Sequence, residues 1–509
     1  MNLVDRIIAT VSPERAVRRA HFRRVLSYYE AAKPSRYRKG RRENASGEGA
    51  VLRAGASLRE QARHLEQNHD LARGILDVLV QNVVGPNGIQ VEPQPRRADG
   101  TIHDEFARQI LDLQRDWARR PEASWQHNWA STQRLVARSV FRDGEALAQR
   151  LTGPVAGLNH GTRIPYSLEL LEADLLPMDH SPLTNIVMGI ERNAWKRPTG
   201  YWLYREHPGD RQFVATAHDL KRVPAARILH PKLVDRIGQM RGVSLFAAVL
   251  TRLDDIKDYE ESERIAAKVA ASMAAFIIKG NPDLYEPPGK DEDPEYRDLK
   301  FRPGMVFDDL EPGESVGTID TNRPNSNLEA HRRGQLRAVA TGTRVGYSSV
   351  SKDYDGSYSS QRQELVESYG AYGVLANEFI GQFVQPTHED MVLAAVASGQ
   401  LTIPPDVVPG SVTEGLYIPP QMPWIDPDKE AKSLERLERN VHASGPEIIR
   451  KRGQNPRDVM EQEANWRRSL REHQMQSDAD PASETLISET EEDHAEEPQG
   501  RTRPSRRRA

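Results

Sequence analysis

The sequence predicts a mainly helical α+β protein that is built from more than one structural unit. Its 509 residues exceed what a single hydrophobic core usually supports, so two to four units are expected. Strand-like runs bounded by Pro, Gly and Asn lie between residues 166 and 207, after three helical patterns. A 36-residue run at 244–279 then contains neither Pro nor Gly. These observations place the first 240 residues in an α+β unit and most of the remainder in helices.

Helical periodicity comes first in the chain. Residues 57–84 place Leu65, Leu71 and Leu79 on one face, and "GPNG" at 85–88 stops this helix. Two further helices are expected over 103–119 and 128–143, the last ending at "RDGE". The strand-like runs that follow are "YSLELLEADLLP" (166–177), "NIVMGIERN" (185–193) and "TGYWLYREH" (199–207).

The run 244–279 is long for a helix of a globular protein. If it is continuous, it extends about 54 Å at ~1.5 Å per residue, and a kink around 258–263 would divide it. Residues 280–320 are rich in Pro and Gly and read as a small insertion of strands and turns. Helical periodicity resumes at 327–342, with Gly342 as the expected stop. The pattern predicts a hairpin of two helices with a small β module at its tip.

A polar, tyrosine-rich stretch, "SKDYDGSYSSQRQELVESY" (351–369), follows the hairpin. Its first half has no apolar run and predicts a loop, whereas its second half is amphipathic. Ser360 with Gln363 three residues later resembles a capping box at the start of the helix. The stripe expected to be buried on that helix comprises Leu365, Tyr369, Tyr372, Leu375, Phe379 and Phe383. Two or three short charged helices are expected over 425–473, and disorder from 476 onwards.

Composition excludes several classes of chemistry. The chain has no cysteine, which excludes disulfides, thiolate zinc sites and cysteine nucleophiles and favours a reducing compartment. The most apolar stretch, "VAASMAAFII" (269–278), is half of the ~20 residues that a bilayer span needs. The N-terminus has an acid, Asp5, and no basic n-region, so it does not read as a signal peptide.

Charge is unevenly distributed although the net charge is only −4. Residues 15–42 contain eleven Lys and Arg against a single acid, Glu30. Such an arm either neutralises phosphates or stays solvated and binds nothing specific, and the sequence leaves both readings open. We expect nine residues of this basic arm to contact phosphates if the arm binds them. They are Arg18, Arg19, Arg23, Arg24, Arg36, Arg38, Lys39, Arg41 and Arg42.

We find no strong catalytic motif, no metal-ligand spacing and no cofactor signature. The phosphate loop, H-E-x-x-H and G-x-S-x-G patterns are missing from the sequence. The short cluster "HED" at 388–390 lacks spaced partner ligands, so a solvated loop or helix cap explains it better than a metal site. A DNA-processing enzyme, such as a nuclease or terminase component, would need clustered carboxylates or a phosphate loop. A shell-forming capsid protein is the other alternative, and the long helical run with its tip insertion argues against it.

Several blocks, taken in order, resemble the portal proteins of lambda-type tailed bacteriophages and prophages. The resemblance covers about residues 25–450. It is carried by "ARHLEQNHDLARGILDVLVQNVVG" (62–85), "FRDGEAL" (141–147), "LELLEADLLP" (168–177), "GIERNAWKRPTGYWLYREHPGD" (189–210), "ILHPKLVDRIGQMRGVSLFAAVLTRLDDIKDYEESERIAAKVAASMAAFI" (228–277) and "DYDGSYSSQRQELVES" (353–368). The tails fall outside it.

The resemblance implies a portal fold of wing, stem, clip and crown that assembles as a ring homo-oligomer, usually of twelve subunits. It implies no enzymatic activity and no cofactor. The parts it implies are a basic N-terminal arm (1–45), a wing (46–243), stem helix 1 (244–279), a clip (280–325), stem helix 2 (326–344), a channel loop (345–358), a wing helix and return (359–424), crown helices (425–475) and an acidic then basic tail (476–509).

The function that this resemblance implies is a DNA conduit at one capsid vertex, for genome packaging, ejection and head–tail connection. The implied partners are other copies of the chain, double-stranded DNA, the terminase large subunit, major capsid and scaffold proteins, and head–tail adaptors, without a membrane. The expected location is the virion, and the host cytoplasm during assembly. The channel candidates are Arg332, Arg333, Arg337, Arg344, Lys352, Asp353 and Arg362, with Tyr354 and Tyr358 expected to prop the loop. Arg332 and Arg333 could equally pair with acids of a neighbouring subunit, and Arg362 could pin the loop to its own helix.

Overall fold

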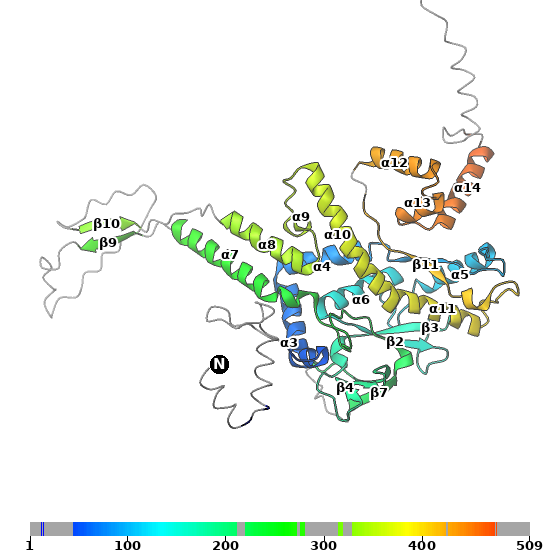
Figure 1. Cartoon of the computed structure of the whole chain (residues 1–509), viewed down its shortest axis with the longest axis horizontal. Coiled ribbons are helices and arrows are strands. Elements are labelled where there is room, and N and C mark those ends of the chain that lie inside the picture. Colours follow the sequence, from blue (N-terminus) through cyan, green and yellow to red (C-terminus); the bar gives the residue numbers. More distant parts are fainter. Residues whose placement is uncertain are drawn as a thin grey trace, which may run out of the picture.

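Helices dominate the computed structural model, and its strands form only small antiparallel sheets (Figure 1). The structure describes residues 44–210, 219–271, 275–279, 314–318, 328–423 and 426–473, with the single residues 12, 14 and 475. The basic arm, most of the expected clip and the expected tail therefore lie outside the described residues. None of the helices in the described ranges combines the length and apolar character that a bilayer crossing requires.

The described helices fall into three groups. The body contains α3 (Gly47–Asn68), α4 (Asp70–Val83), α5 (Asp104–Trp117), α6 (Trp129–Asp143), α9 (Tyr347–Ser351), α10 (Tyr358–Phe379) and α11 (Gln385–Ala397). Two helices, α7 (Leu250–Ala271) and α8 (Leu328–Thr343), project from the body side by side (Figure 1). A separate group contains α12 (Pro427–Arg439), α13 (Gly445–Lys451) and α14 (Pro456–Glu472), and it confirms the expected short charged helices.

The strands form four sheets, and every pairing between them is antiparallel. One sheet has the order β3-β2-β8, with β2 (Leu147–Thr152), β3 (Tyr166–Leu171) and β8 (Ile228–Leu229). A second has the order β4-β5-β6-β7, with β4 (Ile186–Val187), β5 (Ile190–Arg192), β6 (Pro198–Tyr204) and β7 (Leu220–Pro224). The two-stranded sheets pair β1 (Gln90–Pro93) with β11 (Gly415–Ile418), and β9 (Ala275–Lys279) with β10 (Glu314–Thr318). The strand predictions at 166–207 are thus confirmed in type and place.

The main core lies where the body helices meet the β3-β2-β8 sheet. Trp117 packs against Trp129 and Tyr166, with ring centroids 5.1 and 5.8 Å away, and its indole N–H donates to the Tyr166 carbonyl (2.9 Å). Phe383 extends this aromatic contact from the turn between α10 and α11, 5.5 Å from Trp129. The predicted stripe on α10 is buried at Tyr372, Leu375, Phe379 and Phe383, whereas Leu365 and Tyr369 are half-buried.

The single helix predicted over 57–84 is wrong, because α3 and α4 are separated at His69. That residue is extended (φ −131°, ψ 117°) and buried, and its side chain accepts from the Leu71 N–H at the start of α4. The ring nitrogen Nε2 lies 3.1 Å from the Leu253 carbonyl oxygen of α7. The break therefore lets one side chain cap a new helix and fix the base of the projecting hairpin.

The expected helix over 244–279 differs from the structure at both ends. It starts with a 3₁₀ turn at Leu245–Ala248, and α7 runs without interruption through the expected kink at 258–263. The last residues, Ala275–Lys279, form strand β9 instead and pair with β10. The β-branched and aromatic residues of "AFIIK" favour a strand once a partner strand is present.

The expected end of α8 and the expected start of α10 lie within two residues of the observed ones, but the roles given to Gly342 and Ser360 are wrong. Gly342 lies inside α8, and a Cβ there would come 2.5 Å from Val249 Cγ1, so this glycine permits close packing and does not stop the helix. Helix α10 begins at Tyr358, because Ser357 is its N-cap and accepts from the Ser360 N–H. The loop expected at 345–358 also contains the short helix α9, which leaves residues 345–346 and 352–357 without helical structure.

A fully buried carboxylate, Glu145, joins distant segments of the body. Its oxygens accept from Arg241 Nε (2.8 Å), Arg59 Nη2 (3.1 Å), His230 Nε2 (3.0 Å) and the Gly242 N–H (2.8 Å). Burial alone would raise the pKa of Glu145, but the charge of Arg241 and the hydrogen bond from His230 hold it well below its usual range. The carboxylate is therefore ionised in the folded chain and neutralised by two buried guanidinium groups.

We expect Glu145→Gln to lower the free energy of unfolding by about 3–5 kcal/mol, because it leaves the buried Arg241 without its counter-charge and Arg59 with only Asp174. Glu191→Gln is the matched control, since Glu191 pairs with Arg222 at the surface and such pairs contribute about 1 kcal/mol or less. Chemical denaturation of both variants checks the difference. A loss for Glu145→Gln as small as that of the control would contradict this account of the cluster.

Stability should fall as the pH drops from about 6.5 towards 4, because two buried histidines stay neutral in the fold. Burial lowers the pKa of His388 to about 4 and that of His230 to about 4. Below pH 6.5 these histidines are protonated in the unfolded chain but remain neutral in the folded chain. The free energy of unfolding therefore falls by about 1.4 kcal/mol per histidine and pH unit. His388→Phe should flatten this pH dependence, whereas His473→Phe at the exposed end of α14 should leave it unchanged. Unfolding curves at several pH values measure both.

Candidate DNA-channel surface

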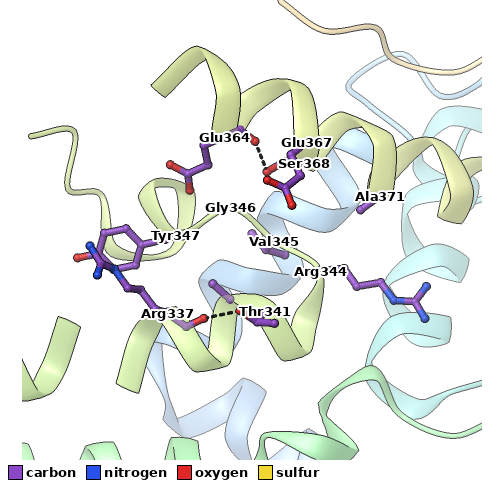
Figure 2. Close-up of a pocket in the computed structure, with 11 residues that line it drawn as sticks. Arg337, Thr341, Arg344, Val345, Gly346, Tyr347, Glu364, Glu367, Ser368 and Ala371 are labelled. Carbon is purple, nitrogen blue, oxygen red and sulfur yellow. Dashed lines mark hydrogen bonds between the residues drawn. The ribbon is translucent and has the colours of Figure 1, made fainter. Parts of the chain in front are cut away.

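The predicted channel residues gather around the end of α8, the short helix α9 and the start of α10. A groove of about 490 Å³ lies between these elements, and Figure 2 shows its lining residues. A smaller groove of about 160 Å³ lies towards the loop at 353–356. Both grooves are lined by Arg337, Tyr347 and Glu364, so these three side chains stand at the boundary between the two.

Tyr347 anchors the loop that sequence analysis identified. Its hydroxyl donates to Asp353 Oδ2 (3.1 Å), and the guanidinium of Arg337 lies over its ring, 5.4 Å from the centroid. The Asp355 N–H and the Tyr347 hydroxyl donate to Asp353 and lower the pKa of that carboxyl. The loop is thus tied to both α8 and α9 through one aromatic side chain.

Glu364 fixes the loop from the other side. Its carboxylate accepts from the Ser348 N–H (2.8 Å) in the first turn of α9. A Cβ on Gly346 would come 2.9 Å from Glu364 Oε1 and 2.9 Å from Ser368 Oγ, so a larger residue there would displace these two side chains. Sequence reasoning missed Tyr347 and Glu364. The signal was the i, i+3 spacing of Tyr347 and Val350, which predicts a helical turn inside the presumed loop.

Three of the predicted channel cations have acidic partners within the chain. Arg332 Nε lies 2.5 Å from Glu260 Oε1 on α7, and Arg333 lies 2.8 Å from Glu329 and 3.6 Å from Asp353. Arg362 lies 3.0 Å from Glu430 on α12, so it connects α10 to the C-terminal helices and does not pin the loop to its own helix. Their charges are largely satisfied before any ligand arrives.

Arg344 and Lys352 differ from these three. Both are exposed, both adopt left-handed backbone conformations (φ 60° and 57°), and neither forms an ion pair with any residue that the structure describes. Figure 2 shows Arg344 extending away from Arg337 and Tyr347. Residues other than glycine are uncommon in this conformation. Here it occurs at the sharp turns that follow α8 and α9, and these turns carry the side chains of Arg344 and Lys352.

The two tyrosines predicted to prop the loop are largely exposed. Tyr354 is 61% exposed, and its carbonyl accepts from the side chain of Gln361. Tyr358 is 51% exposed and is the first residue of α10. The ring that contacts the loop acid is that of Tyr347, and the role of Tyr354 and Tyr358 as props stays a prediction.

One cluster in the described ranges has the composition of a cation site. Glu172, Asp174 and His207 bring their ligand atoms within 4.8 Å of one another. Arg63 Nη2 already lies 2.5 Å from Asp174 and 3.7 Å from Glu172, and Arg59 Nη1 lies 3.4 Å from Asp174. These guanidinium groups supply the positive charge that a metal ion would bring, so the cluster is explained as an ion-pair network.

Comparison with known proteins identifies the family of this chain. The family model for the phage portal protein, lambda family, matches residues 33–375. The probable portal protein of Halomonas phage phiHAP-1 (isolate -/Gulf of Mexico/-/2001) is 26% identical over 438 residues, which cover 83% of this chain and 82% of that protein.

Solved structures give a more distant likeness. A chain in the virion of the native gene transfer agent (GTA) particle is 13% identical, with a TM-score of 0.43 over 78% of this chain and 95% of that one. A chain in the neck of the native GTA particle, computed with C12 symmetry, is 14% identical, with a TM-score of 0.41 over 77% and 90%.

The family model spans more than half of the chain. It includes both helices of the projecting hairpin, the loop at 352–357 and most of α10. The chain therefore belongs to the lambda family of phage portal proteins, whose members are structural proteins of the virion and not enzymes.

Proposed function

We propose that this portal protein assembles as a ring around a DNA channel at the neck vertex of the capsid. In this proposal residues 46–243 form the wing, 280–325 the clip and 425–475 the crown, while α7 and α8 are the stem helices. The ring admits DNA during packaging by the terminase and releases it at ejection, and head–tail adaptors join it through the clip. Capsid and scaffold proteins meet its outer surface during assembly in the host cytoplasm.

The projecting hairpin is the observation that carries this proposal. Contacts pair Tyr259 with His331 (ring centroids 4.9 Å apart) and Glu260 with Arg332, while Arg252 donates to Gln335. The partners run in opposite directions along the two helices, so α7 and α8 are antiparallel. The β9–β10 pair is an insertion between them, and the 352–357 loop and α10 follow directly. This order of parts supports a stem with a clip at one end and a channel loop at the other.

The charge pattern of the hairpin suits a conduit. A wall of free cations would bind phosphates tightly, because each neutralised phosphate adds affinity through counterion release. Here Arg332 and Arg333 are paired with acids, which leaves Arg344 and Lys352 as the strongest candidates for DNA contact. Arg337 is the third candidate. Its side chain is exposed, and its guanidinium lies over the face of the Tyr347 ring.

Negative-stain microscopy of the purified chain tests the ring directly. The proposal expects closed rings with a central hole, because a head-to-tail interface that closes on itself gives cyclic symmetry. Monomers or dimers over a wide concentration range would overturn it.

Replacing residues 352–356 by a Gly-Ser linker of equal length tests the channel loop. The replaced segment is exposed apart from the half-buried Asp353, so we expect rings to form normally. Packaging or retention of DNA should fall, since the linker removes Lys352 and the acid that Tyr347 holds in place. The linker conserves chain length, which separates loop chemistry from the spacing of α9 and α10. Loss of the rings would show that the loop is a subunit contact instead.

A further inference from the structure

Two loops, the turn between β5 and β6 and the segment before α7, present large apolar side chains to solvent. Trp195, in the turn between β5 and β6, is 91% exposed, and Ile237, in the segment before α7, is fully exposed. Lys196 Nζ lies 3.8 Å from the position that a Cβ on Gly238 would occupy, so the Lys196 side chain reaches from the first loop to the second. We name Trp195 and Ile237, with the loops that carry them, the Trp195–Ile237 surface.

Both loops are held in shape by hydrogen bonds. Asn193 Oδ1 accepts from the N–H groups of Trp195 (3.0 Å) and Arg197 (2.9 Å), which closes the first turn. The buried side chain of Gln239 accepts from the N–H groups of Asp235 and Arg236 (both 3.3 Å) and donates to the Arg241 carbonyl (2.8 Å). The exposed side chains are therefore fixed in place by ordered backbone, which lowers the entropic cost of docking against them.

The N-terminal segment of the chain reaches the body at this same surface. Arg236 Nη1 donates to the Ala45 carbonyl (2.8 Å), and Gly47 at the start of α3 packs against Arg236. Arg192, at the end of β5, lies 2.5 Å from Glu48. The chain that precedes residue 44 is thus attached beside Ile237 and beside the strand that leads into the Trp195 turn.

The sequence of that segment has a face that matches the surface. Its apolar residues repeat at i, i+1, i+4, i+5 and i+8, which places them on one side of a helix. These residues are Leu3, Val4, Ile7, Ile8 and Val11. Between Val11 and Glu43 the chain is long enough to return to its own point of attachment in almost any geometry.

Three observations point to the N-terminal segment as the occupant of the Trp195–Ile237 surface. They are the exposed apolar side chains, the nearby attachment point and the apolar face of the segment. We propose that residues 3–11 dock against the Trp195–Ile237 surface of the same copy of the chain. A segment tethered beside a surface is present at an effective concentration of about a millimolar, so it occupies that surface ahead of a free protein. A buried tryptophan at the centre of a contact is also a frequent energetic anchor. This inference stands independently of the proposed function.

Disulfide trapping in the full-length protein tests the docking, because the chain has no cysteine of its own. Ile8→Cys is combined with Ile237→Cys, and the oxidised protein is separated under denaturing, non-reducing conditions. We expect a disulfide within one chain, which requires the two Cα atoms to approach within about 7 Å. Two pairs are matched controls. Ala9→Cys with Ile237→Cys uses the opposite face of the segment, and Ile8→Cys with Met460→Cys uses an exposed residue of α14.

Faster trapping of the Ile8–Ile237 pair than of both controls, at the mass of a single chain, would support the proposal. A ladder of linked chains would overturn it in favour of the segment of a neighbouring copy. Trapping no faster than in the controls would overturn it altogether. Acrylamide quenching of Trp195 gives a second readout, taken as the difference from Trp195→Phe. Replacing Leu3, Ile7 and Ile8 by serine should increase this quenching, and unchanged quenching would contradict the docking.

Discussion

The ionised and fully buried carboxylate of Glu145 is the constraint on which the arrangement of the body depends. A buried charge is tolerated only when its partners are all in place, and here they come from distant parts of the chain. Arg59 belongs to α3, His230 follows β8, and Arg241 precedes α7. Arg241 also donates to the carbonyls of Met188 (3.0 Å) and Ala173 (3.3 Å). A shift of the segment that carries Arg241 would leave that buried guanidinium without the one acid it pairs with in the described part of the chain.

Two glycines make this convergence possible, and they also set the direction of the hairpin. A Cβ on Gly144 (φ 89°) would lie 2.3 Å from the Val243 carbonyl carbon, and one on Gly242 would lie 2.0 Å from the Gly144 oxygen. The two backbones therefore touch, which brings the Gly242 N–H to Glu145. The chain then passes through Ser244, which caps the turn before α7. Helices α7 and α8 thus leave the body from a closely packed junction with a buried ion cluster, and not from a flexible linker.

Features of the fold that depend on residues close together in the sequence could be predicted from it. Helix α6 was predictable because Asn128 caps its start and Gly144 ends it. The break at His69, by contrast, depends on a carbonyl of α7, and the packing role of Gly342 depends on Val249. The candidate site shows the same division. Its residue types could be identified from the sequence, but their pairing could not, since the Glu430 partner of Arg362 lies on a separate group of helices.

The pairing of charges on α8 also connects Arg333 to the loop at 352–357. Arg333 lies between Glu329 and Asp353, and Asp353 is the acid that Tyr347 holds. A phosphate near Arg333 would compete with Asp353 and weaken the hold on the loop. Arg344 and Lys352 are oriented by their backbone at helix ends, so a phosphate can meet them without breaking an ion pair. Phosphate contact at these two positions therefore costs the fold little, whereas phosphate contact at Arg333 would loosen the loop at 352–357.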